Sequence, residues 1–319
     1  MIPDQLLSTI SQKQSFLVAS HSSPDGDAIG SSLALGLALK GMGKDVVIYN
    51  QDGVPKDYTF LPGSSLVVSQ LDQGQQFDVG FVLDAGELRR AGEWIRSRCD
   101  CLVNVDHHPY SENFGEIFFV DVQASATGVL VWRILDQINW PITLDVATCI
   151  YTAILSDTGS FRYSNANREA FSVAGEMVAL GVDPWSIASG LYESQDAARL
   201  RLLALSLPTL KISDSGAYAS VAVTLEMYKQ TGSNAEHTDR FVNYPRSVSG
   251  VEVAIFFRQL DSDTFKVGFR SKGKIDVGSL AREMGGGGHH NAAGATAKGS
   301  LKDVEQWVFR RLDDLLENL

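Results

Sequence analysis

Hydrophobic positions in the first half of the chain alternate between short β-rich runs and longer stretches with helical spacing. This alternation is typical of a parallel sheet with helices on both faces. We expect the strands at 15–20, 44–50, 77–85, 101–106 and 116–121. We expect the helices at 27–43, 125–139 and 143–159, with Ser125 or Thr127 capping the second.

The second half of the chain shows a different order of elements. From about 165 to 207 the spacing is helical throughout, and its last helix is expected to connect two domains. β-rich runs return at 217–223, 251–257 and 264–271, and helical patterns follow at 276–284 and 302–319. The predicted fold is α/β, with an N-terminal parallel-sheet domain joined by a helical connector to a smaller α+β domain. The expected bounds are 1–190, 191–208 and 209–319.

Composition narrows the class of protein. A length of 319 residues suits two domains better than one core. The net charge of −11 argues against a groove for long duplex nucleic acid, but a short anionic ligand at one focused site stays open. Neither a basic leader nor a bilayer-length apolar run is present, so we expect a cytoplasmic protein without membrane contact. The three cysteines contain no C-x-x-C pair and are expected as buried thiols.

Aspartate and histidine residues follow three of the predicted strands and one predicted helix. They are His21, Asp25, Asp27, Asp84, Asp106, His107, His108 and Asp157. Open α/β sheets bind ligands at the carboxyl ends of their strands, where so many carboxylates would repel each other. Two divalent cations sharing a carboxylate would neutralise them, and Asp and His ligands without thiolates favour Mn²⁺.

Each of these motifs also has a purely structural explanation. Asp84 suits a helix N-cap, Asp157 suits the first residue of a turn, and His107 with His108 suits a solvent-exposed pair. The segment "HSSPDGDAIGSS" (21–32) suits a tight turn after a strand. The sequence alone leaves these alternatives open for each motif taken singly.

A glycine-rich stretch, "GGGGHHNAAGAT" (285–296), marks the second domain. Successive glycines let a backbone approach a ligand closely and point N–H groups at an anion, although glycine runs also form flexible loops. Histidines directly after the glycines favour a close-fitting pocket. Upstream, Arg270 ends a predicted strand, where it could reach the same anion or serve as an ordinary surface arginine.

Five stretches resemble the motifs of the DHH phosphoesterase superfamily and of its DHHA1 substrate-binding domain. They are "HSSPDGDAIGSS", "VLDAGELRR", "NVDHHPYSENFG", "ILSDTGSFRYSN" and "RSKGKIDVGSLAREMGGGGHHNAAG". The resemblance implies one metal ion held by His21, Asp25 and Asp84. It implies a second ion held by Asp27, Asp84, His107 and Asp157, so that Asp84 bridges the two.

The resemblance also implies roles around the metal ions. Asp106 would orient its neighbours and His108 would face the substrate phosphate, so the catalytic set is Asp84, Asp106 and His108. A second phosphate would be held by residues of the DHHA1 domain. These are Arg270, Ser271, Gly286, Gly287, Gly288 and His289. No role is implied for His290.

The function implied is metal-dependent hydrolysis of short oligoribonucleotides (nanoRNA) to mononucleotides, or of 3′-phosphoadenosine 5′-phosphate (pAp) to AMP. A water activated by two ions, Mn²⁺ before Mg²⁺ or Co²⁺, would attack phosphorus. Expected ligands are short single-stranded RNA or DNA fragments or nucleotide phosphates, and a homodimer stays open. The alternatives are a hydrolase of cyclic di-AMP or its linear product pApA, a RecJ-like single-strand exonuclease, and a non-catalytic nucleotide sensor.

Overall fold

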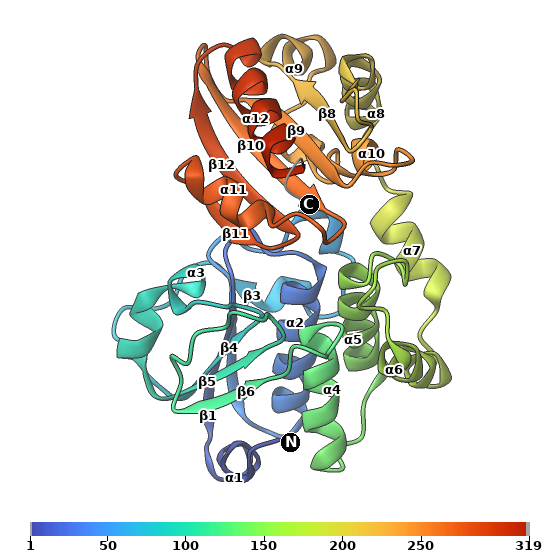
Figure 1. The fold of residues 1–319 in the computed structure, drawn as a ribbon. Coiled ribbons are helices and arrows are strands. Elements are labelled where there is room, and N and C mark those ends of the chain that lie inside the picture. The colour runs from blue at the N-terminus through green and yellow to red at the C-terminus, as the bar shows by residue number, and fades with distance from the viewer. Residues whose placement is uncertain (1, 317–319) are drawn as a thin grey trace. The chain divides into compact units, whose positions relative to one another are not determined.

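A computed structural model describes residues 2–316, apart from the side chain of His289, and shows two compact units (Figure 1). The first unit comprises residues 1–194 and the second comprises residues 195–319. The helix at the predicted connector, α8 (Ala197–Ser206), packs against β8 and α9 and belongs to the second unit.

The first unit is built on a six-stranded parallel sheet with the strand order β3-β2-β1-β4-β5-β6. Its strands are β1 (Ser15–Ser20), β2 (Asp45–Tyr49), β3 (Val67–Val68), β4 (Phe77–Leu83), β5 (Cys99–Asp106) and β6 (Ile117–Val120). β1 pairs with β2 on one side and with β4 on the other. The direction of winding therefore reverses between β1 and β4, and ligands bind at such a switch point in open α/β sheets.

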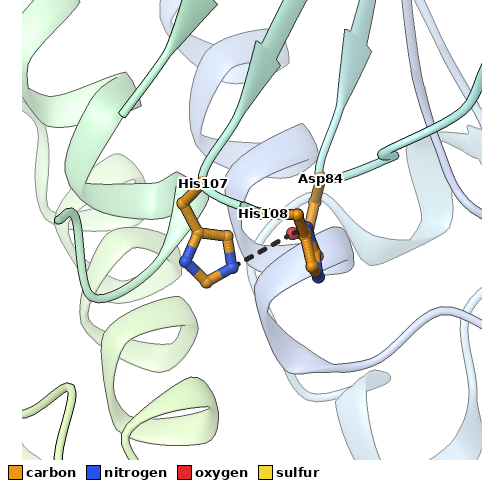
Figure 2. A group of neighbouring side chains, drawn as sticks. All are labelled: Asp84, His107 and His108. Carbon is orange, nitrogen blue, oxygen red and sulfur yellow. Dashed lines mark ion pairs between the residues drawn. The ribbon is translucent and has the colours of Figure 1, made fainter. Parts of the chain in front are cut away.

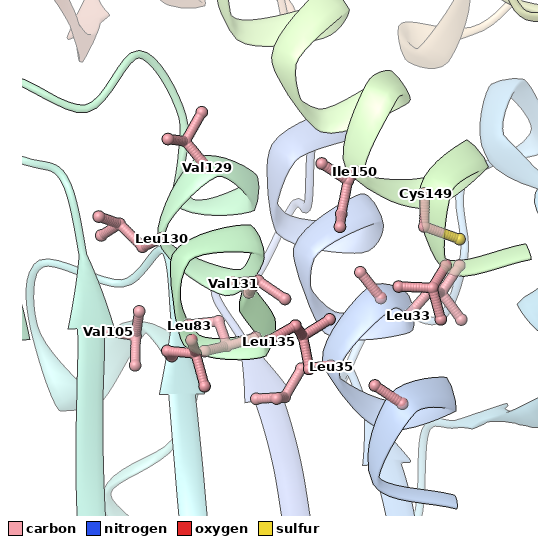
Figure 3. Close-up of a cluster of buried hydrophobic side chains, with 14 of the residues drawn as sticks. Leu33, Leu35, Leu83, Val105, Val129, Leu130, Val131, Leu135, Cys149 and Ile150 are labelled. Carbon is pink, nitrogen blue, oxygen red and sulfur yellow. The ribbon is translucent and has the colours of Figure 1, made fainter. Parts of the chain in front are cut away.

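Helices cover both faces of this sheet, as predicted. They are α1 (Asp4–Gln12), α2 (Gly26–Gly41), α3 (Leu88–Ala91), α4 (Thr127–Gln137), α5 (Leu144–Asp157), α6 (Arg168–Ala179) and α7 (Pro184–Tyr192). α2 packs against the sheet on one side and against α4 and α5 on the other, which explains why it is apolar around most of its circumference. Figure 3 shows part of the resulting core, where Leu33 and Leu35 of α2 lie among buried side chains of α4 and α5.

The second unit contains a mixed sheet with the strand order β11-β12-β10-β9-β8-β7. Its strands are β7 (Lys211–Ile212), β8 (Tyr218–Val223), β9 (Val253–Gln259), β10 (Thr264–Ser271), β11 (Gly287–His289) and β12 (Ala292–Lys298). Its further helices are α9 (Leu225–Thr231), α10 (Asn243–Arg246), α11 (Val277–Glu283) and α12 (Leu301–Leu316). The sheet forms a core with apolar side chains of α11 and α12.

The glycine-rich stretch of the second unit forms part of a hairpin, in which β11 pairs antiparallel with β12 and β12 pairs with β10. The structure therefore rules out the flexible loop that the sequence left open as an alternative. Glycine and alanine have low β-propensity, so the pattern of this stretch gave no strand signal. The strand β12 is held in the sheet by its pairing with β10, in which Arg270 lies opposite Ala292.

The cysteines and the helices bear on two further expectations. Cys149 is buried, but Cys99 and Cys101 are only partly so, which corrects the prediction of three buried thiols. Burial nevertheless raises the pKa of Cys99 to about 12, so this thiol stays protonated near neutral pH. None of the helices within residues 2–316 is long and apolar enough to cross a lipid bilayer.

Candidate metal centre

Three strand ends and two helix ends of the first unit bring the predicted residues together. They are His21 after β1, Asp84 after β4, Asp106 at the end of β5 with His107 and His108 following, Asp25 and Asp27 at the start of α2, and Asp157 at the end of α5. Asp84 has a φ of +55°, a left-handed conformation that aspartate tolerates better than most residues. This conformation ends β4 and leaves Asp84 almost fully buried at the switch point.

Asp84 lies at the centre of the group because its two carboxylate oxygens face different histidines. Oδ2 lies 3.5 Å from Nε2 of His21, and Oδ1 lies 3.5 Å from Nε2 of His107. Figure 2 shows Asp84 next to His107 and His108, which follow the neighbouring strand. A carboxylate with one oxygen on each side is suited to bridging two cations.

Nε2 of His107 has two further carboxylates around it. Oδ2 of Asp27 lies 3.7 Å away and Oδ2 of Asp157 lies 3.8 Å away. These separations are too long for good hydrogen bonds, which rarely exceed about 3.2 Å. Ligand atoms at roughly 2.1 Å from one cation lie about 3–3.5 Å apart, so the observed spacing is close to that of atoms around a shared ion. The four residues are those implied for the second metal ion.

The second group of donor atoms comprises His21, Asp25 and Asp84, whose ligand atoms lie within 4.8 Å of one another. Oδ1 of Asp25 lies 4.0 Å from Nε2 of His21, and 54% of the Asp25 side chain is exposed. The same oxygen caps α2, because it accepts the N–H groups of Asp27 and Ala28 at 3.0 Å each. The segment 21–32 therefore does both things considered for it: it forms a turn after β1, and it brings His21 and Asp25 close to Asp84.

Hydrogen bonds to the main chain fix the tautomers of two histidines. Nδ1 of His21 lies 2.8 Å from the carbonyl oxygen of Ser22, and Nδ1 of His107 lies 3.2 Å from that of Ala124. Because a carbonyl can only accept, each Nδ1 carries the proton. In the neutral form each ring points its Nε2 lone pair at carboxylates, a repulsion that either a bound cation or a proton on Nε2 relieves.

The pKa values show how strongly these groups depend on one another. Burial, and next the charge of Asp84, raise the pKa of Asp27 well above its ordinary value. Burial raises the pKa of Asp157 to about 6. Burial opposes ionisation of Asp84 too, but His107 and His21 hold its pKa well below the ordinary value. Positive charge is thus needed to keep all three carboxylates ionised together.

Asp106 orients the two histidines that follow it. It is fully buried, and its Oδ1 accepts the N–H of His107 at 2.8 Å and Nδ1–H of His108 at 2.7 Å. Burial alone would lower the pKa of His108, but the hydrogen bond to Asp106 raises it. Because a carboxylate oxygen accepts, this contact places a proton on Nδ1 of His108.

The structure reveals supporting residues that the sequence reasoning missed. The first N–H groups of α4, from Thr127 and Gly128, donate to Oδ2 and Oδ1 of Asp27 at 2.6 and 2.9 Å. The α4 N-cap is Ala126, so the prediction of Ser125 or Thr127 as the cap is wrong. Asn165 donates to Oδ2 of Asp157 at 3.0 Å. Gly128, at the second position of α4, was a signal in the sequence for close packing at the start of this helix.

The geometry decides between the structural alternatives for the single motifs. α3 begins at Leu88 with Glu87 as its N-cap, so Asp84 is not a helix cap. The side chains of His107 and His108 are only 13% and 20% exposed and do not form a surface pair. Asp157 ends α5 instead of starting an isolated turn.

The predicted residues of the second unit lie on β10 and on the hairpin. Arg270 is partly buried and its Nη1 donates to the carbonyl of Phe269 at 2.9 Å. Ser271 is buried, and its hydroxyl donates to Oε1 of Glu252 at 3.2 Å. Glu252 also accepts the N–H of Lys274 at 2.7 Å, so Ser271 helps to order the turn after β10.

Two of the predicted glycines have a structural reason to be glycine. A Cβ at Gly286 would lie 2.2 Å from the carbonyl oxygen of Gly294, and a Cβ at Gly288 would lie 2.5 Å from Cα of Ala293. Gly288 also has a φ of +140°. A Cβ at Gly287, by contrast, would meet nothing within 4 Å. The predicted role of His289 concerns a side chain outside the described part of the chain.

Comparisons with known proteins match both units. The model of the DHH family, N-terminal domain, matches residues 15–154, and that of the DHHA1 domain matches residues 215–318. A Thermus thermophilus protein named bifunctional oligoribonuclease and PAP phosphatase NrnA is 33% identical over 95% of this chain and 89% of its own. Its Bacillus subtilis namesake is 27% identical over 92% of both chains. A crystal structure of an exopolyphosphatase-related protein from Bacteroides fragilis matches with a TM-score of 0.91 and 29% identity, covering 99% of this chain and 95% of the other.

Proposed function

The chain belongs to the DHH family of phosphoesterases, and from this premise we propose that it hydrolyses short oligoribonucleotides and pAp. Two relatives named for these two activities match it over most of their length, at 33% and 27% identity. One observation carries the proposal: the two oxygens of Asp84 each lie 3.5 Å from Nε2 of a different histidine.

The donor set fits two divalent cations. His21, Asp25 and Asp84 would hold one ion, and Asp27, Asp84, His107 and Asp157 would hold the other. Mn²⁺ suits mixed carboxylate and imidazole ligands, and Mg²⁺ or Co²⁺ are the alternatives. Bound there, the ions supply positive charge and an acidified water for attack on phosphorus.

The residues of the chain have separate tasks around a bound phosphate ester. Asp84 fixes the two halves of the site relative to each other. Asp106 holds His108 through the 2.7 Å contact at Nδ1, so that Nε2–H of His108 can donate to a phosphate oxygen. Burial opposes protonation of His108, but the hydrogen bond to Asp106 raises the pKa of the ring, which favours the doubly protonated form that has an Nε2–H.

The second unit would bind another phosphate of the same substrate. Arg270 offers a planar fork of N–H donors, and the exposed Lys272 and Lys274 add positive charge nearby in the sequence. Gly287 leaves its backbone open to a ligand. A short substrate such as pAp or a dinucleotide suits a chain with a net charge of −11 better than a long nucleic acid does.

Initial rates with purified full-length protein and Mn²⁺ test the proposal. The substrates are pAp, a 5′-labelled RNA dinucleotide, a long single-stranded RNA, cyclic di-AMP and pyrophosphate. The Asp84→Asn protein serves as the blank, and Asp45→Asn, at an exposed position at the start of β2, is the matched control. We expect rapid hydrolysis of pAp and the dinucleotide by the wild-type and Asp45→Asn proteins. Preference for the long RNA or for cyclic di-AMP, or no hydrolysis above the blank, would contradict the proposal.

A further inference from the structure

We propose that Thr127 is a positioning residue that sets the spacing between Asp27 and Asp84 and thereby tunes one of the two cation sites. The inference rests on the cation sites of the proposed function. Thr127 is the first residue of α4 and is fully buried. Its main-chain N–H donates to Oδ2 of Asp27 at 2.6 Å, and its hydroxyl donates to Oδ1 of Asp84 at 3.2 Å. One residue therefore holds two carboxylates that come from different elements.

The start of α4 is built to receive Asp27. Its N-cap, Ala126, has no side chain that could cap the helix. Asp27 takes that place from α2, since its two oxygens accept the N–H groups of Thr127 and Gly128. The positive end of a helix dipole stabilises a carboxylate held in this way.

Close packing keeps this arrangement rigid. A Cβ added at Gly128 would lie 2.5 Å from Cβ of Ala153 in α5, so only glycine lets the two helices approach this closely. α5 also carries Asp157 at its end. The position of α4 relative to Asp27 and Asp157 is thus fixed by backbone packing, and Thr127 extends that rigidity to Asp84.

The two oxygens that Thr127 contacts are the same two that face His107. Oδ2 of Asp27 lies 3.7 Å from Nε2 of His107, and Oδ1 of Asp84 lies 3.5 Å from it. The other oxygen of Asp84 faces His21. Thr127 should therefore govern the site formed with His107 and Asp157, and leave the site formed with His21 and Asp25 largely unchanged. Hydrogen bonds to metal ligands typically change metal affinity by about 10–100-fold.

Calorimetric titration of the chelator-treated full chain with Mn²⁺ alone tests this assignment. Thr127→Val removes the hydroxyl but keeps the N–H and the side-chain shape, and Thr127→Ser keeps the hydroxyl. The matched control is Thr152→Val, because Thr152 is equally buried but its hydroxyl donates to the carbonyl of Thr148 at 2.8 Å, within α5. Thr127→Ala replaces Thr127→Val if the latter does not fold.

We expect two binding events in the wild-type protein and weakening of only one, by about 10–100-fold, in Thr127→Val. Thr127→Ser and Thr152→Val should resemble the wild-type protein. In rate assays excess Mn²⁺ should restore Thr127→Val, which a merely misfolded variant would not show. If Thr127→Val binds Mn²⁺ as the wild-type protein does, or if both of its binding events weaken equally, the inference is overturned. This holds even if the wild-type protein cleaves pAp. If the wild-type protein binds two Mn²⁺ ions but hydrolyses none of the substrates, the proposed function is overturned. The inference then still stands, provided that Thr127→Val weakens only one of the two binding events.

Discussion

The candidate sites of the two units carry opposite kinds of side-chain charge. The first unit gathers carboxylates and imidazoles at the carboxyl ends of β1, β4 and β5, where a phosphate would be repelled unless cations were bound. The second unit offers positive side chains directly, from Arg270 on β10 and from Lys272 and Lys274 after it. The proposed function therefore requires added cations in the first unit, whereas the second unit has positive charge within the chain.

The largest effect should come from the shared carboxylate of the first unit. Asp84→Asn removes the charge that both histidines face, and we expect kcat to fall by at least about 10³-fold. Initial rates with pAp measure the loss, and circular dichroism checks that the fold persists. Near-normal turnover in a folded Asp84→Asn protein would contradict the bridging role.

A smaller effect should follow from removing a positive charge in the second unit. Arg270→Ala should raise KM for pAp by about 10–100-fold with little change in kcat, because a charge-assisted hydrogen bond contributes about 1.5–3 kcal/mol. Lys266→Ala, at an exposed position of the same strand, is the matched control. A fall in kcat alone would place Arg270 outside the anion site.

Substitutions of two hairpin glycines should differ in their effect on stability. Gly288→Ala forces a Cβ against Ala293 at a φ of +140°, and we expect a loss of about 1–3 kcal/mol in the free energy of unfolding. Gly287→Ala meets no atom within 4 Å and should leave that free energy nearly unchanged. Thermal and urea unfolding measure both variants.

The variants Gly287→Ala and Gly288→Ala also test whether the hairpin of the second unit binds substrate. If the open backbone at Gly287 contacts the second phosphate, Gly287→Ala should raise KM for pAp without loss of stability. Equal destabilisation of the two variants would show that the hairpin geometry described here is wrong.

The first unit could be predicted from the sequence far better than the hairpin of the second. β1, β4 and β5 are apolar runs followed directly by Asp or His, so one pattern indicated both the strands and the chemistry at their ends. Several charged side chains that all lie at strand ends are hard to explain by structure alone, so they indicated a site. A run of glycines fits more than one structure, and the pattern at 285–288 did not distinguish a loop from a strand that approaches β12 closely.

Interactions between distant segments account for the rest of what the sequence could not show. The cap of α4 was missed because Asp27 lies 100 residues before Thr127, and no local rule links the two. The contact of Thr127 with Asp84 depends in the same way on the packing of α2, α4 and α5 around the sheet.

The most direct test of the central claim is the position of Mn²⁺ in a crystal of the full chain. Anomalous diffraction from a crystal grown with Mn²⁺ locates each ion without assumptions about the ligands. The account predicts two peaks in the first unit, each next to a different oxygen of Asp84, one on the side of His21 and the other on the side of His107. A single peak, or two peaks that do not share Asp84, would contradict it.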